Sequence, residues 1–453
     1  MTESGASARL PNRDFRPAPF WWDECPPPEE PPAPLPARCD VAIVGGGIGG
    51  LCAALELARH GAAVALLEAD AFGFNASTRN SGGVSFGLDL AKVARWARWT
   101  GRKGPGIAEL AKGALESLVH TEDFIARNAI DCDYHRRGRL SCASTPRHFE
   151  ALSRRAETLN RLFDANARVL TRSEQHAEIG SERFHGALVI ERSGQLNPAR
   201  YVRGLIRLCE EAKVSRHART LVQRVERTKT SFRLTTSAGP LEAEAVIVAT
   251  NAQSARLPCV GLRKRVIPVA SHIIVTEPLP EALAEQLIPR RRTGADSRRL
   301  LAYFRRTPDG SRFLYGSRAA PFEVSPQRAA EVLYRRMVAS FPSLAGVRIT
   351  HAWGCKVAFT LDALPHMGEI DGVHYLAGCN GNGVAMMTYL GQRVARKLLE
   401  RARTACVFDR AEFPRVPLYD GRPWFLPPAA AAYRALDFLD TLSSHYGTKA
   451  RQA

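Results

Sequence analysis

Residues 39–68 read CDVAIVGGGIGGLCAALELARHGAAVALLE, and this stretch decides how the chain begins to fold. An apolar run, a glycine turn, a helical pattern and a second apolar run ending in an acid predict strand, turn, helix and strand. Gly45, Gly47 and Gly50 form a G-x-G-x-x-G turn, whose glycines allow a tight turn and a close backbone approach. Glu68 is placed to accept hydrogen bonds from a ribose. The stretch predicts a Rossmann-like dinucleotide-binding unit.

Composition sets wide limits on the class of protein. Hydrophobic residues make up 45% and charged residues 24% of 453, as in an ordinary globular protein, and no uncharged run is long enough to span a membrane. Residues 1–40 contain no apolar signal segment and the ten cysteines form no C-x-x-C pair, so we expect a cytoplasmic protein with reduced thiols. The net charge of +18 comes mainly from dispersed arginines. We interpret it as a solvated surface and expect no nucleic-acid partner.

A second motif identifies the family. Residues 72–83 read FGFNASTRNSGG and follow the first strand–helix–strand unit. With Glu68, the Ser77, Arg79 and Asn80 pattern resembles the FAD-binding oxidoreductases of the D-amino-acid oxidase and glycine oxidase superfamily. That family reads close to E-x-x-x-x-G-x-G-A-S-x-R-N-G-G. This chain departs from it by the extra Ser81 before the glycine pair and by an asparagine at position 75, where glycine is usual.

The resemblance covers roughly residues 38–400. LNPARYVRGL, TLVQRV and AVIVATNA match its central elements, and YFRRTPDGSRFLYGSR matches its substrate-domain hairpin. HAWGCKVAFTLDALPHMG and LAGCNGNGVAMMTYLG match its two C-terminal flavin motifs. Trp21-Trp22-Asp23 and the segment 423–427, PWFLP, resemble the bacterial amine-oxidising branch that includes γ-glutamylputrescine oxidase.

This resemblance implies an α/β fold with an α+β substrate part. A Rossmann-like FAD-binding domain of the glutathione-reductase type would interleave with an antiparallel-sheet substrate domain. We expect a proline-rich tail at 1–37, in which FWW at 20–22 could pin the tail to the body, and a C-terminal extension at 406–453. The FAD-binding domain would comprise 38–90, 191–255 and 351–405. The substrate domain would comprise 91–190 and 256–350.

The motifs also imply which residues hold FAD. A glycine loop that opens a helix near residue 383 would place the helix N-terminus at the flavin's pyrimidine end, where reduced flavin is anionic. The expected FAD contacts are Gly45, Gly47, Ile48, Gly49, Gly50, Glu68, Ala69, Ser77, Arg79, Asn80, Ser81, Gly82, Val222, Thr250, Cys355, Asn380, Gly381, Asn382, Gly383 and Val384.

The implied reaction oxidises the C–N bond of a small-molecule amine or amino acid. Hydride passes to flavin N5, the imine then hydrolyses, and oxygen or a quinone accepts the electrons. No obligatory acid or base stands out in the sequence. The pocket candidates are His272, Tyr303, Trp353 and Asn382, although the aromatic residues and the histidine could equally be core side chains.

One substrate-binding residue of the family is absent. Amino-acid oxidases of this superfamily often read W-x-G-x-R-P-x-T-P-D, and that arginine grips the substrate carboxylate. Val357 occupies its position here, and Lys356 would face the other side of the strand. We therefore expect an amine, or an amino acid bound in another way. Arg305 or Arg318 could supply the alternative grip.

Cys355 raises a separate question. Monomeric sarcosine oxidases link FAD covalently to a cysteine in the stretch C-x-Y-T-x-T-P-D, and Cys355 has the same spacing to Asp362. The amine-oxidising branch more often has glycine there and unlinked FAD. A covalent 8α-S-cysteinyl link and an unlinked thiol beside the flavin remain alternatives.

Two other functions of the protein are also open: an RNA-modifying flavoprotein, and a non-catalytic FAD-binding partner.

Overall fold

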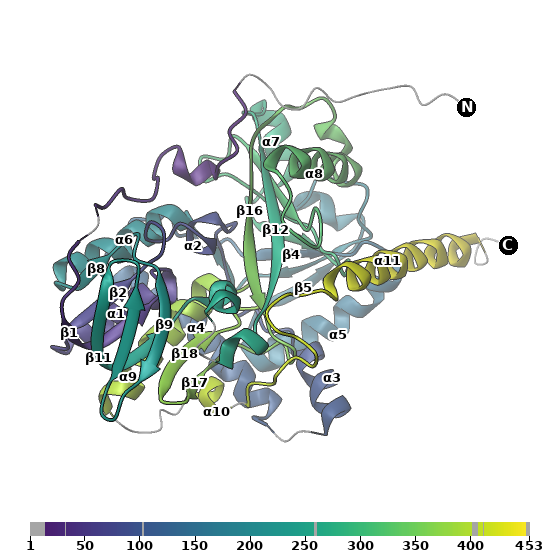
Figure 1. Ribbon diagram of the computed structural model, residues 1–453. Coiled ribbons are helices and arrows are strands. Elements are labelled where there is room, and N and C mark those ends of the chain that lie inside the picture. Colours follow the sequence, from purple (N-terminus) through teal and green to yellow (C-terminus); the bar gives the residue numbers. More distant parts are fainter. Residues whose placement is uncertain are drawn as a thin grey trace.

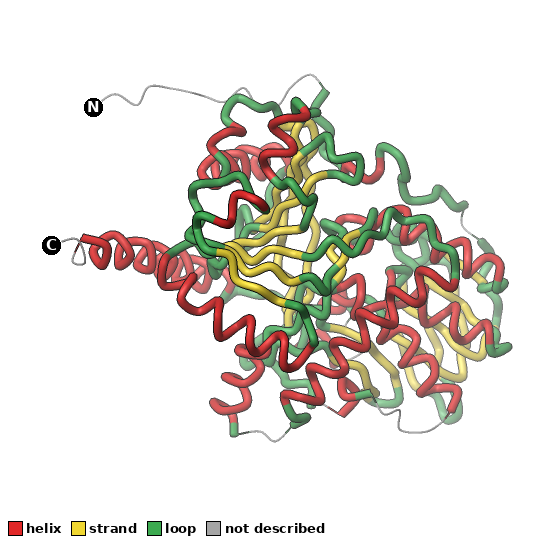
Figure 2. The backbone as a smooth tube through the Cα atoms, turned by 180° about the vertical axis from the view of Figure 1, so that it is seen from behind, coloured by secondary structure: helices red, strands yellow, loops and turns green. Residues whose placement is uncertain are grey.

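Two eight-stranded sheets organise the molecule, as a computed structural model shows (Figures 1 and 2). The structure describes residues 14–31, 33–101, 104–257, 261–400, 406–410 and 412–449. In the first sheet the order is β17-β18-β11-β1-β2-β8, with β10 and β9 continuing from β11. The strands are β1 (Arg38–Val44), β2 (Val64–Leu67), β8 (Ser215–His217), β9 (Val222–Arg227), β10 (Phe232–Thr236), β11 (Gly239–Val248), β17 (His366–Ile370) and β18 (Val373–Ala377).

The second sheet has the order β16-β12-β15-β14-β13-β4-β6-β5. Its pairs are antiparallel except for β13 and β4, which run parallel. The strands are β4 (Arg139–Cys142), β5 (Ala167–Leu170), β6 (Ala187–Ile190), β12 (Ile267–Thr276), β13 (Thr293–Asp296), β14 (Tyr303–Arg306), β15 (Phe313–Ser317) and β16 (Ile349–Phe359), and a small ribbon joins β3 (Gly83–Val84) to β7 (Gly194–Gln195).

Helices cover both sheets (Figure 2). Their bounds are α1 (Ile48–Arg59), α2 (Ala76–Arg79), α3 (Leu90–Thr100), α4 (Ile107–Arg127), α5 (Pro146–Phe163), α6 (Pro198–Glu211), α7 (Glu281–Leu287), α8 (Pro326–Ser340), α9 (Gly383–Glu400), α10 (Val407–Arg410) and α11 (Leu426–Lys449). Short 3-10 turns lie at η1 (Phe20–Trp22), η2 (Glu174–Ala177), η3 (Asn251–Arg256), η4 (Gly261–Lys264) and η5 (Pro342–Leu344). Among the helices described, none is both long and apolar enough to cross a membrane.

The predicted strand–helix–strand unit is present, as β1, α1 and β2, and the parallel pairing of β1 with β2 and β11 confirms the Rossmann-like sheet. One boundary was wrong. Residues 351–359 were assigned to the FAD-binding domain, but they belong to β16, which pairs with β12 in the second sheet. β12 and β16 are both long and match residue by residue from Ile267 opposite Phe359, so backbone pairing holds this segment in the substrate sheet. The last part of the first sheet begins at β17.

The N-terminal segment is ordered by side-chain contacts. Residues 1–13 of the expected tail lie outside the described residues. From residue 14 onward the segment runs over the surface from the second sheet to the first (Figure 1). Its backbone bridges to His351, and η1 buries Trp21, so FWW does pin the tail to the body.

Close approach of α1 and α9 depends on glycine at their crossing. A Cβ on Gly391 would lie 2.4 Å from the Gly49 carbonyl oxygen, and a Cβ on Gly50 would lie 1.9 Å from the Gly45 carbonyl oxygen. Both contacts are with backbone, which cannot rotate away as a side chain can. The glycine at position 391 therefore allows α9 to pack directly on α1, and the glycine at position 50 allows α1 to pack on the glycine turn.

We expect Gly391→Ala to destabilise the protein by about 1–3 kcal/mol, because the added methyl group forces α9 away from α1. Thermal unfolding followed by circular dichroism measures this as a lower Tm. Gly104→Ala is the matched control, because a Cβ there meets no atom within 4 Å. An unchanged Tm for the Gly391 variant would show that the two helices can separate without cost.

Candidate functional site

The glycine turn after β1 and the acid after β2 form the predicted dinucleotide cradle. Gly47 caps the N-terminus of α1, and the Ile48 N–H donates to the Ser77 hydroxyl at 3.1 Å. The Glu68 carboxylate accepts from the Gly46 N–H at 2.7 Å and from the Asp70 N–H at 3.0 Å. Burial raises the pKa of Glu68 despite these bonds. An acid beside a helix N-terminus and a glycine turn is the donor and acceptor set that ribose and pyrophosphate require.

Two further expected contacts close the cradle from neighbouring segments. The Thr220 N–H donates to the Glu68 carbonyl at 2.7 Å, which brings the start of β9, with Val222, alongside Glu68 and Ala69. On the other side Thr250 follows β11, and its hydroxyl pairs with that of Ser254 at 2.8 Å. The structure thus brings these predicted residues together around the carboxyl ends of β1, β2 and β11, where ligands of open α/β sheets bind.

The loop after α2 is fixed by donors from three distant segments. Three successive backbone carbonyls, those of Arg79, Asn80 and Ser81, accept from Trp353 Nε1 at 2.8 Å, Trp21 Nε1 at 2.9 Å and Arg305 NH1 at 3.0 Å. Because a partly buried carbonyl without a partner is costly, each donor stabilises the loop conformation. The loop holds the expected FAD contacts of residues 77–82, and its conformation depends on the N-terminal segment and on the second sheet.

Two side chains of the same loop, those of Arg79 and Asn80, also form hydrogen bonds to nearby backbone groups. The Arg79 guanidinium lies 4.6 Å from the ring centroids of both Trp22 and Phe74, which are themselves 5.3 Å apart, and Nε donates to the Phe74 carbonyl. Asn80 donates to the carbonyls of Ala76 and Ser77 and accepts from the Gly82 N–H at 2.8 Å. Arg79 and Asn80 therefore shape the loop from within, whereas Ser77 faces the start of α1.

Arg305 and Trp353 have structural roles. The Arg305 guanidinium is buried and donates to the carbonyls of Ser81, Leu196 and Arg306, each at 3.0 Å. Burial lowers its pKa to about 9. These bonds occupy Nε and both hydrogens of NH1, which argues against the expectation that Arg305 grips a substrate. Trp353 is equally buried, and its indole N–H serves the loop.

One face of the second sheet carries the polar groups nearest the loop. Cys355 lies opposite Ser271, whose hydroxyl pairs with that of Tyr303 at 2.9 Å. Burial raises the pKa of Cys355 to about 12, although the Arg79 guanidinium acts in the opposite direction. Burial also raises the pKa of Tyr303 well above its usual range. Both groups are therefore protonated at neutral pH.

The opposite face of the same strands holds His272 and Lys356. His272 lies opposite Gly354, one position away from Cys355, so its ring points to the other side of the sheet. It is buried, burial lowers its pKa, and Nδ1 has no partner among the described residues. Lys356 forms an ion pair with Glu323 at 2.8 Å. The structure separates both residues from Tyr303 and Cys355.

The second glycine loop lies between β18 and α9. Asn380 accepts from the Thr360 N–H at 3.1 Å and donates to the Gly378 carbonyl at 2.7 Å. Asn382 accepts from the Ser85 hydroxyl at 3.1 Å. Around Gly381, which has a φ of +94°, a Cβ would meet nothing, so the backbone of the loop is accessible. Gly381, Gly383 and Val384 thus lead into the helix N-terminus, while both asparagines hold the loop in place.

Arg318 was named from the sequence, and its surroundings single it out. It follows β15, its guanidinium lies 5.2 Å from the centre of the Phe359 ring, and burial lowers its pKa. Among the described residues, the acidic groups that approach it are the phenols of Tyr303 and Tyr433. Within the described chain, Arg318 is a cation beside Tyr303 with no carboxylate partner.

The C-terminal extension closes this face, which the sequence analysis did not anticipate. Val416 and Tyr419 are buried against Ile267 and Val269 of β12, with Phe359 packed against them. The Tyr419 hydroxyl donates to the Val266 carbonyl at 2.8 Å. Apolar and aromatic residues in a segment thought to be an appendage were the available signal.

Comparisons with known proteins agree with this geometry. The DAO family model, described as FAD dependent oxidoreductase, matches residues 40–397. γ-Glutamylputrescine oxidoreductase of Escherichia coli (strain K12) is 32% identical, over 88% of this chain and 92% of the relative. Glycine oxidase of Geobacillus kaustophilus (strain HTA426) is 27% identical, over 83% and 96%. A crystal structure of glycine oxidase from Geobacillus kaustophilus superposes with a TM-score of 0.68 at 25% identity, covering 84% of this chain and 99% of that one.

We expect Trp21→Phe to weaken FAD binding, because it leaves the Asn80 carbonyl without its donor. The loss of about 0.5–1.5 kcal/mol corresponds to a roughly two- to twelve-fold higher Kd. Titration of the apoprotein with FAD, followed by quenching of flavin fluorescence, measures it. Trp99→Phe is the control, because Trp99 is exposed on α3. Equal affinities for the two variants would contradict a role of the N-terminal segment in the cofactor loop.

Proposed function

Because this chain belongs to the DAO family of FAD-dependent oxidoreductases, we propose that it oxidises the C–N bond of an amine that also carries a carboxylate, which Arg318 holds. The family and the amine- and amino-acid-oxidising relatives establish the reaction class and favour it over RNA modification. The observation that supports the carboxylate is the unpaired Arg318 beside Tyr303 in the described chain.

FAD would be held by the glycine turn, Glu68, the loop of residues 77–82 and the second glycine loop. When bound, it accepts a hydride from the carbon next to the substrate nitrogen, and the imine product hydrolyses. The N–H groups at the start of α9 favour negative charge at that end of the site. The three donors on carbonyls 79–81 keep the cradle preorganised.

The polar groups of the substrate face orient the substrate and do not take its proton. Tyr303 and Cys355 have raised pKa values and are themselves protonated at neutral pH. The amine must therefore bind in its neutral form. The hydroxyl pair of Tyr303 and Ser271 can donate to and accept from that neutral nitrogen. Val357 and Val269 lie opposite each other on the same face and supply an apolar wall.

A substrate with one amine and one carboxylate fits this arrangement. The Escherichia coli relative is named for γ-glutamylputrescine, a compound that carries both an amine and a carboxylate. We propose oxygen or a quinone as the electron acceptor, which an anaerobic assay with a soluble quinone distinguishes. The nine described cysteines are all free thiols, which supports our expectation of a cytoplasmic enzyme.

Arg318→Met tests the substrate assignment. We expect kcat/KM for a γ-glutamyl amine to fall roughly 10- to 150-fold, since charge-assisted hydrogen bonds contribute about 1.5–3 kcal/mol. An alkyl amine of the same length without the carboxylate should react equally well with variant and parent. Arg328→Met is the control, because Arg328 pairs with Glu331 on the surface of α8. Equal losses on the two substrates would remove Arg318 from carboxylate binding.

We propose that FAD is bound without a bond to Cys355. The thiolate is the form of cysteine that attacks the flavin, and the raised pKa of Cys355, about 12, keeps the thiol protonated at neutral pH. Below that pKa the thiolate fraction rises about tenfold with each unit of pH. Acid precipitation should leave a colourless pellet and a yellow supernatant. A yellow pellet that becomes colourless in Cys355→Ala would demonstrate the covalent link.

A further inference from the structure

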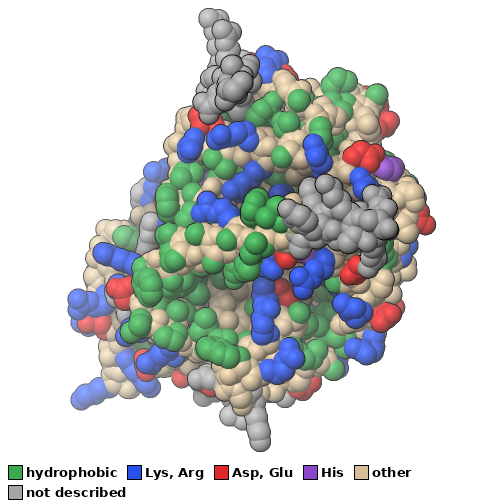
Figure 3. Space-filling model, turned by 90° about the vertical axis from the view of Figure 1, so that its right-hand side faces the viewer, with side chains coloured by type: hydrophobic (Ala, Val, Ile, Leu, Met, Phe, Trp, Pro, Cys, Tyr) green, Lys and Arg blue, Asp and Glu red, His purple; other side chains and the backbone are tan. Residues whose placement is uncertain are grey.

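The face from which α11 projects is unusual in its surface chemistry. Figure 1 shows α11 leaving the body at the end of the C-terminal extension, and Figure 3 shows that hydrophobic and basic side chains gather on this side of the molecule. Of the eleven large hydrophobic side chains that are exposed in the described chain, seven lie between residues 418 and 442. They are Leu418, Trp424, Tyr433, Leu436, Phe438, Leu439 and Leu442.

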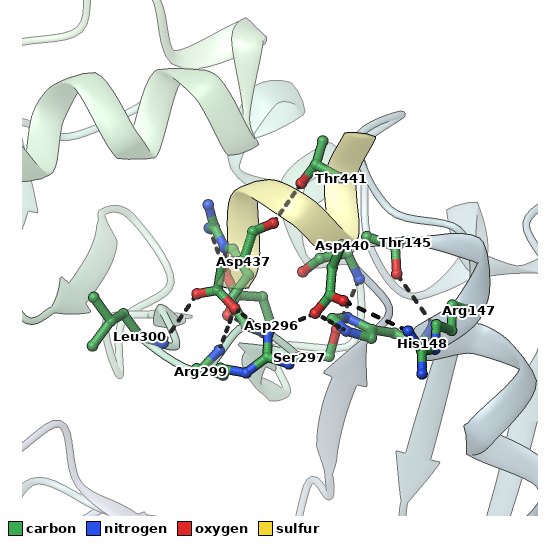
Figure 4. Close-up of polar contacts among 12 residues, drawn as sticks. Thr145, Arg147, His148, Asp296, Ser297, Arg299, Leu300, Asp437, Asp440 and Thr441 are labelled. Atoms are coloured by element: carbon green, nitrogen blue, oxygen red, sulfur yellow. Dashed lines mark hydrogen bonds and ion pairs between the residues drawn. The ribbon is translucent and has the colours of Figure 1, made fainter. Parts of the chain in front are cut away.

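The helix is attached through its acidic residues. Asp437 and Asp440 point toward the body, where Arg299 NH1 donates to them at 3.0 Å and 2.6 Å (Figure 4). Asp440 also lies 3.6 Å from His148 Nε2 and 3.9 Å from Arg147 NH1. Arg299 lowers the pKa of Asp440, as a neutralising partner should. The polar edge of α11 therefore faces the protein.

The apolar residues consequently face solvent. Phe438 is 63% exposed, Leu439 is 56% exposed, and Trp424 just before the helix is 62% exposed. A surface helix of a globular protein normally turns such residues inward and its charges outward. In α11 this arrangement is reversed, so the exposed face lacks a partner in the described chain.

Charge decides what that partner is. Between residues 426 and 442 the acids are Asp437 and Asp440, both turned inward, and the exposed charge is Arg434. Arg422, which is exposed just before the helix, adds a second positive charge, and the whole chain carries +18. A second copy of the chain would bring two basic surfaces together, which is unfavourable. An anionic surface is complementary.

We propose that α11 docks the enzyme on an anionic lipid bilayer, with Leu436, Phe438, Leu439 and Leu442 inserted at the level of the headgroups. The exposed aromatic and aliphatic side chains can insert at the membrane interface, and Arg434 can pair with anionic headgroups. Trp424 lies at its start, where an indole suits the interface. The extension also packs on β12, so the substrate-binding face is held close to the bilayer.

Cosedimentation of the holoenzyme with vesicles tests the proposal. We expect binding to vesicles of phosphatidylcholine and phosphatidylglycerol, loss of binding as salt is raised, and little binding to phosphatidylcholine alone. The double variant Phe438→Ser, Leu439→Ser should partition roughly tenfold or more weakly, because two apolar side chains no longer insert. Leu221→Ser is the matched control, since Leu221 is exposed elsewhere.

Light scattering and turnover keep the outcomes distinct. The double variant should match the parent in molar mass, Tm and kcat on a soluble substrate, because neither side chain touches the site. If the parent is a dimer and the variant a monomer, and the parent does not bind vesicles, the face is a protein interface and the proposal fails. It also fails if variant and parent cosediment equally.

Discussion

Three hydrogen bonds to consecutive carbonyls join the cofactor loop of residues 77–82 to the second sheet and to the N-terminal segment. The carbonyls of Arg79, Asn80 and Ser81 accept from an indole of β16, an indole of the N-terminal segment and a guanidinium of β14. Each of these hydrogen bonds to a partly buried carbonyl contributes about 0.5–1.5 kcal/mol. The conformation of the cofactor loop therefore depends on the second sheet and on the N-terminal segment. Neither sheet is independent of the other.

This dependence explains which features the sequence could predict. The turn after β1, α1, β2 and Glu68 follow from a local pattern whose parts touch one another, so reading the residues in order was sufficient. The place of β16 does not follow from its own residues. Its membership in the second sheet is decided by pairing with β12, which is distant in sequence. The resemblance placed it next to the flavin, and that proximity is compatible with either sheet.

The candidate site divides in the same way. Because side chains alternate along a strand, Lys356 and Val357 lie on opposite faces of β16, as the sequence predicts. By the same rule, His272 lies on the face opposite to the one that carries Cys355. The roles of the tryptophans were not predictable, because an indole in an apolar run looks the same whether it fills the core or donates to a loop. The C-terminal extension was missed since its contacts with Ile267 and Val269 are long-range. Local sequence patterns thus identified the polar residues, but only the fold shows which face of the sheet each of them occupies and which groups it contacts.

The two arginines of the β14–β15 hairpin show why position alone was insufficient. Both are buried to some degree and both were plausible substitutes for the arginine replaced by Val357. Arg305 donates to three carbonyls, so turning its guanidinium toward a substrate would break three hydrogen bonds. Arg318 has the Phe359 ring 5.2 Å away and the phenols of Tyr303 and Tyr433 nearby, and among the described residues no carboxylate pairs with it. A desolvated guanidinium without a described carboxylate gains most from an anionic ligand, which is why carboxylate recognition falls to Arg318.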